Sequence, residues 1–163
     1  MSTRDAPVSL LRCDSPLGRI ELTGDGTTIT TLSIERDGRL PHDGLPEASD
    51  AVLERAAAQL DEYFAGTRQA FDLPLSLCGT PFQQAVWEQL AALPYGETSS
   101  YAELGATVGR PRAARAVGGA VGANPIPIIV PCHRVLGADG RITGYSAGEG
   151  APTKAWLLAH EAA

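Results

Sequence analysis

The sequence predicts an α+β fold, because strand patterns fill the first forty residues and helical patterns dominate the rest. Its 163 residues are 44% hydrophobic and 20% charged, the composition of an ordinary globular chain with one domain or two small ones. This mixture excludes a disordered chain, a collagen and a coiled coil.

The N-terminal strands are predicted where apolar and β-branched residues alternate with polar ones. They cover residues 8–13, 19–23 and 28–34. A turn at 15–18 separates the first two, and the glycines at 24–26 indicate a hairpin between the next two. After a loop rich in Gly, Pro and Asp, a helical period appears over 48–64, and Gly66 ends that helix. Residues 71–77 fit either one more strand or an extended linker.

The second half of the chain is predicted to be mostly helical, with helices over 80–93, 100–108, 112–123 and 153–161. Ser100 and Glu103 form a capping box, and Pro111 is placed to open the helix that follows the turn at 109–111. Two short helices joined by such a glycine-containing turn are typical of a helix-turn-helix. The remaining segments are a buried strand or extended stretch and a glycine-rich loop, at 126–135 and 137–150.

The net charge of −6 argues against a nucleic-acid binder until it is divided along the chain. Residues 1–95 carry 7 basic and 14 acidic side chains, whereas residues 96–145 carry 5 arginines and 3 acidic side chains. An acidic half is therefore joined to a mildly basic one, and the local field matters more than the total. Charge alone leaves open whether the asymmetry is chance or the footprint of a nucleic-acid site.

The N-terminus and the cysteines predict a cytoplasmic protein with no membrane segment. Residues 1–9 lack the apolar stretch of a signal peptide, and the longest apolar run, 126–130, is too short to cross a bilayer. The three cysteines are widely spaced and form no CxxC pair, so free thiols in a reducing compartment are expected. No cluster has the spacing of a zinc site, and neither a metal nor another cofactor is expected.

The second helix of the predicted helix-turn-helix, residues 112–123, has an unusual composition. It contains Gly118, Gly119 and Gly122, each of which costs roughly 1 kcal/mol relative to alanine inside a helix. Most of its other residues are alanines, so something must approach its backbone closely. One interpretation is tight packing on another helix. The other is a nucleic-acid groove, which Arg112 and Arg115 on the same helix favour.

Cys132 stands between Pro131 and His133. A thiol becomes a nucleophile only as the thiolate, and a nearby imidazole is a usual means of producing one. Neighbours in a strand point to opposite faces, however, so His133 could act only through a bend or a bridging water. Local sequence therefore leaves open whether Cys132 is reactive or inert. Cys13 and Cys78 have no such neighbours and are interpreted as structural or incidental.

Glu161 follows two leucines by three and four residues in the last predicted helix, so it continues an apolar stripe. A carboxylate turned inward needs a partner such as an imidazole, whereas a solvated residue at a frayed helix end needs none. Both interpretations stay open. His42 and His160 are expected at the surface, and Tyr101 shares a face with apolar residues and fits a simple core position.

Several segments together carry a specific signature. Residues 124–135 read NPIPIIVPCHRV. Further segments, in chain order, are SPLG at 15–18, TPFQ at 80–83 with VW at 86–87, PYGET at 94–98, SY at 100–101, AARAVG at 113–118 and WLLAHE at 156–161. In all of them, over nearly its whole length, the chain resembles the O6-alkylguanine-DNA alkyltransferases, also called methylated-DNA–protein-cysteine methyltransferases.

The resemblance implies two domains and a DNA partner. Residues 1–77 would form a small α/β domain with an antiparallel sheet, and residues 78–163 a mostly helical domain with the helix-turn-helix and the cysteine. In this family the helix-turn-helix enters the minor groove of double-stranded DNA that contains O6-alkylguanine, and a narrow groove accounts for the small residues. A monomer without an obligate protein partner is expected, and cooperative binding to DNA is left open. The expected DNA contacts are Arg112, Ala114, Arg115, Gly118 and Gly119.

The resemblance also implies direct repair of DNA by a single-turnover transfer. The alkylated base would be flipped out of the stack, with Arg115 filling the vacated space. Cys132 as thiolate would take the alkyl group irreversibly. Glu161 would orient His133, which would accept the thiol proton through a water.

The remaining implied roles concern the flipped base. Tyr101 would give a proton or hydrogen bond to guanine N3. Backbone groups of the nucleophile, Val135 and Ser146 would read the base, with Tyr145 as a wall of the pocket. Asn124 would brace the turn before the cysteine.

Two departures from the family pattern bear on these expectations. Some members bind zinc through N-terminal Cys and His residues, but Cys13, Cys78 and His42 match no such site, so no metal is expected. The sequence also ends two residues after Glu161, which leaves open whether a short C-terminus weakens the Glu161 contact. No separate regulatory domain is evident.

Three other functions fit part of the sequence. A non-catalytic protein that recognises alkylated DNA is the first alternative, but relatives of that kind have replaced the nucleophile, whereas Cys132 is present. A thiol hydrolase or redox enzyme would need a resolving Cys or a distant His–Asn pair. A plain helix-turn-helix regulator would explain Arg112 and Arg115 but not the cysteine motif.

Overall fold

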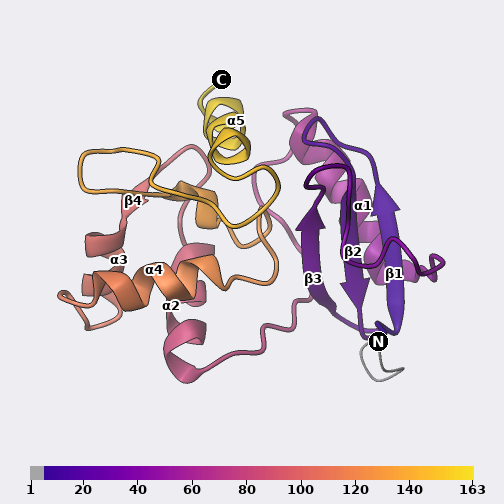
Figure 1. The fold of residues 1–163 in the computed structure, drawn as a ribbon, viewed down its shortest axis with the longest axis horizontal. Helices are drawn as coiled ribbons and strands as arrows, with labels where there is room; N and C mark the ends of the chain where they lie inside the picture. The colour runs from indigo at the N-terminus through magenta and orange to yellow at the C-terminus, as the bar shows by residue number, and fades with distance from the viewer. Residues whose placement is uncertain (1–5) are drawn as a thin grey trace. The chain divides into compact units, whose positions relative to one another are not determined.

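The computed structural model describes residues 6–163, and its contacts divide the chain into two compact units, Met1–Ser76 and Leu77–Ala163. The first unit contains a three-stranded sheet and one long helix, and the second contains four α-helices and two very short strands (Figure 1). The predicted α+β class is confirmed. No helix within residues 6–163 has the length and apolar character that crossing a bilayer requires.

The sheet of the first unit consists of β1 (Ser9–Cys13), β2 (Ile20–Gly24) and β3 (Ile29–Ile34). The three strands pair antiparallel in chain order. Asp25 forms the predicted hairpin turn, since its carboxylate accepts hydrogen bonds from the N–H groups of Thr27 and Thr28 at 3.0 and 2.7 Å.

The helix of the first unit, α1 (Ala51–Phe64), begins at Asp50, whose carboxylate accepts a hydrogen bond from the N–H of Leu53 at 2.9 Å. Its buried residues Leu53 and Leu60 belong to a core shared with β1 and β2. Residues 71–77 form an extended linker with a single bridge to β3, which answers the question that the sequence left open.

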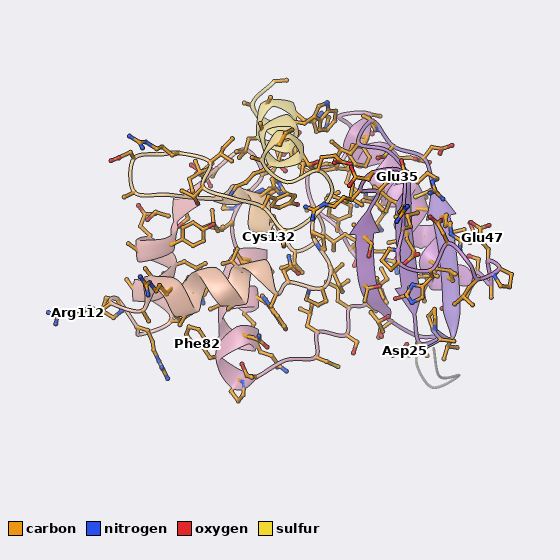
Figure 2. The ribbon with its side chains drawn as sticks, viewed as in Figure 1. Asp25, Glu35, Glu47, Phe82, Arg112 and Cys132 are labelled. Atoms are coloured by element: carbon orange, nitrogen blue, oxygen red, sulfur yellow. The ribbon has the colours of Figure 1, made fainter. Side chains whose placement is uncertain are left out.

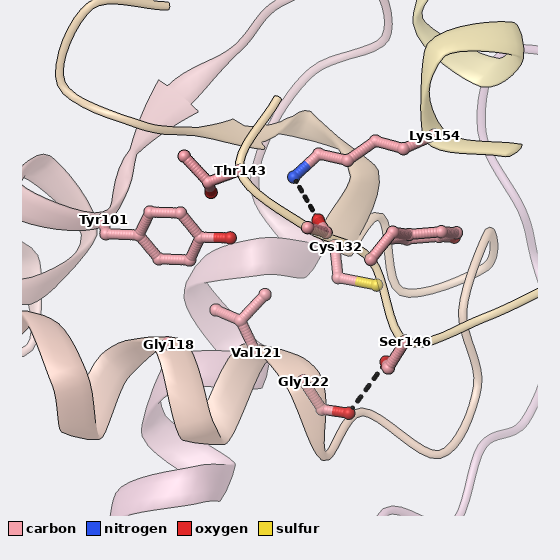
Figure 3. Close-up of a pocket in the computed structure, with 10 residues that line it drawn as sticks. Tyr101, Gly118, Val121, Gly122, Cys132, Thr143, Ser146 and Lys154 are labelled. Carbon is pink, nitrogen blue, oxygen red and sulfur yellow. Dashed lines mark hydrogen bonds between the residues drawn. The ribbon is translucent and has the colours of Figure 1, made fainter. Parts of the chain in front are cut away.

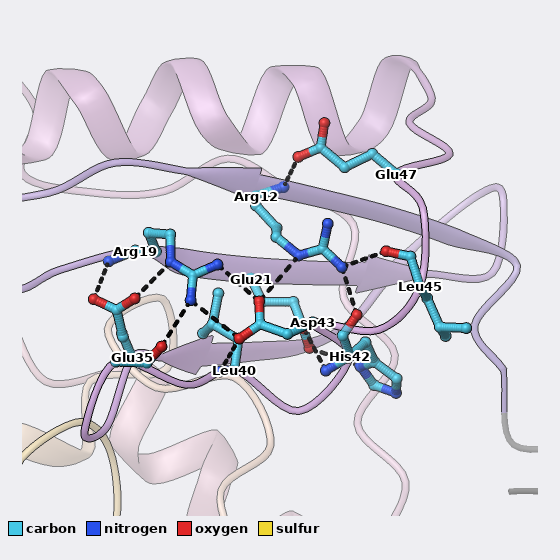
Figure 4. Close-up of polar contacts among 10 residues, drawn as sticks. Arg12, Arg19, Glu21, Glu35, Leu40, His42, Asp43, Leu45 and Glu47 are labelled. Carbon is cyan, nitrogen blue, oxygen red and sulfur yellow. Dashed lines mark hydrogen bonds and ion pairs between the residues drawn. The ribbon is translucent and has the colours of Figure 1, made fainter.

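A polar network ties the loop after β3 to the sheet (Figure 4). Arg19 pairs with Glu35 and with Asp43, at 2.7 Å for the latter, at a half-exposed position. Glu21 is fully buried and accepts hydrogen bonds from the backbone N–H and Nδ1 of His42 at 2.9 and 2.8 Å. The prediction of His42 as a plain surface residue is therefore wrong, because a buried carboxylate in β2 requires a donor.

The second unit follows the predicted order of helices. Its elements are α2 (Pro81–Ala91), β4 (Ser99–Ser100), α3 (Tyr101–Thr107), α4 (Ala114–Gly122), a 3₁₀ turn (Cys132–Arg134), β5 (Val135–Leu136) and α5 (Ala151–Ala162). Thr80 and Gln83 cap α2 reciprocally. Ser100 caps α3 as predicted, but the Glu103 carboxylate accepts a hydrogen bond from Ser99 Oγ, so the predicted capping box is only half formed.

The helix-turn-helix differs from the prediction at its turn. The N–H of Ala113 donates to Arg110 O at 3.1 Å, so Pro111 occupies the second position of a tight turn, and α4 begins at Ala114 rather than at 112. A Cβ on Gly105 of α3 would lie 2.8 Å from Arg110 O, which explains why α3 carries a glycine there. Arg112 thus lies in the turn and not on the helix.

Candidate active site

Glu161 is the centre of a buried polar cluster in the second unit. It comes from α5, and its side chain is only 2% exposed. It accepts a hydrogen bond from His133 Nε2 at 2.7 Å and two from Arg134, from Nε at 2.8 Å and from Nη2 at 3.0 Å. The inward-facing interpretation of Glu161 is therefore correct, and the imidazole partner expected from the sequence is present.

Arg134 is a member of this cluster that the sequence did not single out. Besides Glu161, it donates from Nη1 to Leu93 O at 2.6 Å, and its guanidinium lies 5.7 Å from the ring centroid of Tyr95. Its charge is thus neutralised inside the protein, although it contributed to the positive charge counted over 96–145. In the sequence, the one feature that could have pointed to Arg134 is its position directly after His133.

His133 is fully buried and carries one ring nitrogen without a partner among residues 6–163. Burial lowers the pKa of His133 below its ordinary value of about 6.5, and the bond to Glu161 acts in the opposite direction. The imidazole is therefore neutral at pH 7. Because Nε2 donates to Glu161, the lone pair lies on Nδ1, the nitrogen that is free to accept a proton.

Cys132 begins the 3₁₀ turn and is 3% exposed. Of the buried strand or extended stretch predicted to continue through 131–135, only Val135 lies in a strand, so the argument that placed Cys132 and His133 on opposite faces of a strand does not apply. Burial raises the pKa of the Cys132 thiol, while hydrogen bonds from Asn124 and Tyr145 and the charge of Lys154 lower it. The resting group is therefore a thiol, and the three neighbouring groups only partly offset the cost of forming its anion in a buried place.

The turn before Cys132 is irregular and strained, not a strand. Ile128 has a φ of +73°, a conformation that a β-branched residue adopts only when its surroundings impose it. Asn124 imposes it in part, because its side chain donates to Val130 O at 2.8 Å and accepts from the N–H of Ile126 at 3.0 Å. Asn124 thus braces the chain immediately ahead of the cysteine.

A pocket of about 210 Å³ opens beside Cys132 (Figure 3). Its lining residues come from α3, α4, α5 and the glycine-rich loop. They are Tyr101, Gly118, Val121, Gly122, Cys132, Thr143, Gly144, Tyr145, Ser146 and Lys154. Ser146 Oγ donates to Gly122 O at 2.9 Å, which ties the loop to the end of α4. Tyr101, assigned no more than a core position by its helical face, lies in the wall of this pocket.

Lys154 is the second residue of the site that the sequence did not single out. Its side chain is fully buried, and its Nζ donates to Gly144 O at 3.1 Å and lies 5.9 Å from the ring centroid of Tyr101. Burial lowers the pKa of the Lys154 ammonium, and the neighbouring Cys132 acts in the opposite direction. A buried cation beside a thiol stabilises the thiolate.

The structure brings together most of the predicted site residues. Cys132, Tyr101, Tyr145 and Ser146 line one pocket. His133 and Glu161 form one cluster behind it, and Asn124 holds the turn between. Val135 is buried in β5, and within the described residues it is not among those that line the pocket.

The glycine-rich face of α4 is open. A Cβ on Gly119 or Gly122 would meet no atom within 4 Å, and one on Gly118 would only reach Tyr101 Cε1 at 4.0 Å. Tight packing on another helix is therefore the wrong explanation for these glycines. The helix packs instead through its opposite side, where Trp87 Nε1 donates to the carbonyl of Ala120 at 2.8 Å.

Arginines flank this open face. Ala114 and Arg115 are exposed on α4 itself. Arg112 reaches outward from the preceding turn (Figure 2), and Arg110 lies over the ring of Phe82 at 5.2 Å from its centroid. Within residues 6–163 none of these three guanidinium groups pairs with a carboxylate. An apolar, side-chain-poor helix surrounded by unpaired positive charges is suited to a polyanion.

Comparisons with known proteins agree with this description. A family model described as 6-O-methylguanine DNA methyltransferase, DNA binding domain, matches residues 81–163. A second model, described as the ribonuclease-like domain of the same methyltransferase, matches residues 11–77.

Individual relatives match along most of their length. The chain is 49% identical over 142 residues to the methylated-DNA–protein-cysteine methyltransferase of Mycobacterium leprae, with 83% of this chain and 82% of that protein aligned. It is 45% identical over 149 residues to the constitutive enzyme of Bacillus subtilis, with 89% and 90% aligned. The crystal structure of Mycobacterium tuberculosis OGT in complex with DNA superposes with a TM-score of 0.83 and 46% identity, covering 93% of this chain and 91% of that one. The chain therefore belongs to the methylated-DNA–protein-cysteine methyltransferase family.

Proposed function

We propose that this protein repairs DNA by transferring the alkyl group of O6-alkylguanine irreversibly to its own Cys132. The observation that carries the proposal is the position of Cys132 in a pocket whose wall is shared with α4. The same part of α4, from Gly118 to Gly122, thus carries the open glycine face and lines the pocket that contains the Cys132 thiol. A nucleotide extruded from DNA bound on α4 enters the pocket directly.

The partner in this proposal is double-stranded DNA, approached from the minor groove by a protein monomer. A minor groove about 6 Å wide admits a helix only if its side chains are small, as those around Gly118 and Gly119 are. The oxygen to be dealkylated is buried in the base stack, so the base must be flipped out, and Arg115 is the side chain that would fill the gap. The three cysteines are free, which fits work in the reducing cytoplasm.

The thiol is activated by the cluster behind the pocket. His133 Nδ1 takes the proton of Cys132 through a bridging water, and Glu161 stabilises the imidazolium that forms. The Lys154 ammonium favours the thiolate through its charge. Neutral His133 at pH 7 is in the correct state to act as the base.

The transfer itself is an in-line displacement. Cys132 Sγ forms a bond to the alkyl carbon, the carbon–O6 bond breaks, and its electron pair goes to the guanine. Tyr101 offers a proton or hydrogen bond to guanine N3 as this charge develops. Tyr145 packs against the base, and backbone groups of Val135 and Ser146 read its edge. The product is a thioether, which is not a leaving group, so each chain reacts once.

The alternative is a protein that recognises alkylated DNA without reacting. It requires an inert Cys132, which the convergence of Asn124, Tyr145 and Lys154 on that thiol argues against.

Comparing Cys132→Ala with Cys78→Ala separates the two functions. Both variants should bind a duplex containing O6-methylguanine as the wild type does, because neither thiol lies on α4. Transfer of a radiolabelled methyl group to protein should disappear in Cys132→Ala and persist in Cys78→Ala, whose thiol is exposed and outside the pocket. Labelling that survives in Cys132→Ala, or is absent from the wild type, contradicts the proposal.

A further inference from the structure

We propose that Arg141 binds the backbone phosphates of the DNA strand that carries the flipped nucleotide, at the edge of the pocket formed by the glycine-rich loop. The inference rests on the proposed function and deepens it, because it assigns a phosphate contact outside the helix-turn-helix. Three observations support it: the loop borders the pocket, backbone hydrogen bonds fix its turn, and Arg141 has only a weak surface ion pair.

Two elements border the pocket on the sides where bound DNA would lie. One is α4, with Gly118 and Gly122, and the other is the loop, with Thr143 and Gly144. A nucleotide whose base enters the pocket keeps both of its phosphates, and these stay outside because they join the sugar to its neighbours in the strand. The extruded strand therefore runs across the pocket mouth, beside the loop, and its phosphates need positive partners on that side.

Arg141 is held next to this mouth by a compact turn. It lies two residues before the pocket-lining Thr143 in an irregular part of the loop. The N–H of Gly137 donates to Arg141 O at 2.9 Å, and the N–H of Gly140 donates to Gly137 O at 3.0 Å. A Cβ on Gly137 would lie 2.7 Å from Thr143 Cγ2, so Thr143 packs directly on that glycine.

The guanidinium of Arg141 has no structural task that would explain it. Its side chain is 79% exposed, and the nearest carboxylate, that of Asp139, lies 3.9 Å away and is 76% exposed. Such a surface pair contributes little. Within the described part of the chain Arg141 makes no other ion pair. Arg134, in contrast, is buried and donates two hydrogen bonds to Glu161. An arginine fork suits a phosphate in two-point contact.

The first test is a comparison of Arg141→Ala with wild type on two substrates. Each phosphate contact makes affinity fall with roughly the 0.9 power of salt concentration, so at about 0.1 M salt its loss weakens duplex binding on the order of fivefold to tenfold. The plot of log affinity against log salt should become shallower by about one unit. Alkyl transfer from O6-benzylguanine as a free base should be unchanged, because that substrate has no phosphate.

Two matched variants control for charge. Asp139→Asn removes the carboxylate that lies 3.9 Å from the guanidinium and should tighten duplex binding, the opposite direction from Arg141→Ala. Arg55→Ala makes the same change of net charge on α1, beside Asp72, and should leave both binding and its salt dependence as in the wild type.

The position of the contact is tested with DNA that carries a neutral methylphosphonate. Placed next to O6-methylguanine, the methylphosphonate should weaken wild-type binding by a similar factor but should weaken Arg141→Ala little further, because both changes remove one interaction. Additive losses, or an unchanged affinity and salt dependence of Arg141→Ala, would overturn the assignment. A failed function is recognised separately, as a wild type that binds the duplex but transfers nothing from DNA or free base.

Discussion

The Arg19 cluster of the first unit and the Glu161 cluster of the second unit use charged side chains in opposite ways. In the first unit Arg19 shares its guanidinium between Glu35 and Asp43 at a half-exposed position, so each group keeps a partner or water when another is lost (Figure 4). In the second unit a single buried carboxylate, Glu161, holds both His133 and Arg134. The comparison shows that the Arg19 cluster can lose one ion pair and keep another, whereas the cluster behind the pocket depends on one carboxylate.

The largest expected effect comes from removing the charge of the buried carboxylate. Glu161→Gln leaves Arg134 as an uncompensated buried charge and leaves His133 and Arg134 to share one neutral amide oxygen. We expect alkyl transfer to fall by a factor of at least about 100 and the free energy of unfolding to fall by about 3 kcal/mol. Single-turnover kinetics and denaturant titration measure the two effects. Glu35→Gln in the first unit is the matched control and should retain full transfer activity.

The next effect separates support from chemistry within the cluster. Arg134→Met keeps the His133–Glu161 bond but removes the buried guanidinium, which donates hydrogen bonds to Glu161 and to Leu93 O. The free energy of unfolding should fall by about 3 kcal/mol, as for other broken buried pairs, while transfer should slow by only about tenfold. Arg19→Met should shift the unfolding midpoint much less. Equal shifts for both arginines would break the contrast between the units.

The dependence of transfer on pH should also distinguish the units. Because burial lowers the pKa of His133, the neutral base persists below pH 6.5 and is lost only when acidification passes the lowered value. Transfer should therefore stay high through about pH 6.5 and decline only at more acidic pH, as the lowered pKa of His133 is passed. The unfolded chain binds that proton more readily, so the stability of the second unit should decline in the same direction.

The Arg19–Asp43 pair of the first unit should not respond over that range. Hydrogen bonds from Arg19 lower the pKa of Asp43 to about 2, so this contribution to stability is lost only as the pH falls from the ordinary range of the carboxyl toward that value. Rates measured from about pH 5 to about pH 9, with unfolding followed in parallel, check both statements. A rate that does not change across the acidic limb would remove His133 from the role of base.

The smallest effect has opposite signs for stability and for DNA binding. Gly119→Ala adds a Cβ that meets no protein atom within 4 Å. The helix should gain about 0.5–1 kcal/mol in the free energy of unfolding, while binding to duplex DNA should weaken several-fold because the added methyl group enters the groove. Thermal unfolding and a DNA titration provide the two measurements. A stabilised variant with unchanged DNA affinity would mean that α4 does not approach the DNA closely.

Local signals were enough to predict much of the fold from the sequence. Alternation located the three strands, Asp25 and its glycines located the hairpin, and Ser100 located the start of α3. These features depend on residues that are neighbours in the chain. The inward position of Glu161 was also accessible, because helical spacing alone places it on the apolar stripe.

The rest depended on contacts between distant residues or on ambiguous local chemistry. Proline is equally suited to the first turn of a helix and to the second position of a tight turn, so Pro111 alone could not locate the start of α4. Nothing local distinguishes Arg134 and Lys154 from surface cations. The carbonyl groups that accept their hydrogen bonds belong to Leu93 and Gly144, which are 41 and 10 residues away in the chain. The buried strand or extended stretch predicted at 126–130 is instead an irregular turn, because the left-handed conformation of Ile128 is imposed by its surroundings and not by its residue type.

The central claim, transfer to Cys132 and to no other residue, is tested most directly by intact-protein mass measurement after incubation with excess O6-methylguanine duplex, followed by peptide mapping. We expect a gain of one methylene per chain, saturating at one and located on Cys132, with Cys13 and Cys78 unmodified. An unchanged mass while the duplex stays bound, or a methyl group on another residue, would contradict the account of the pocket and of the cluster behind it.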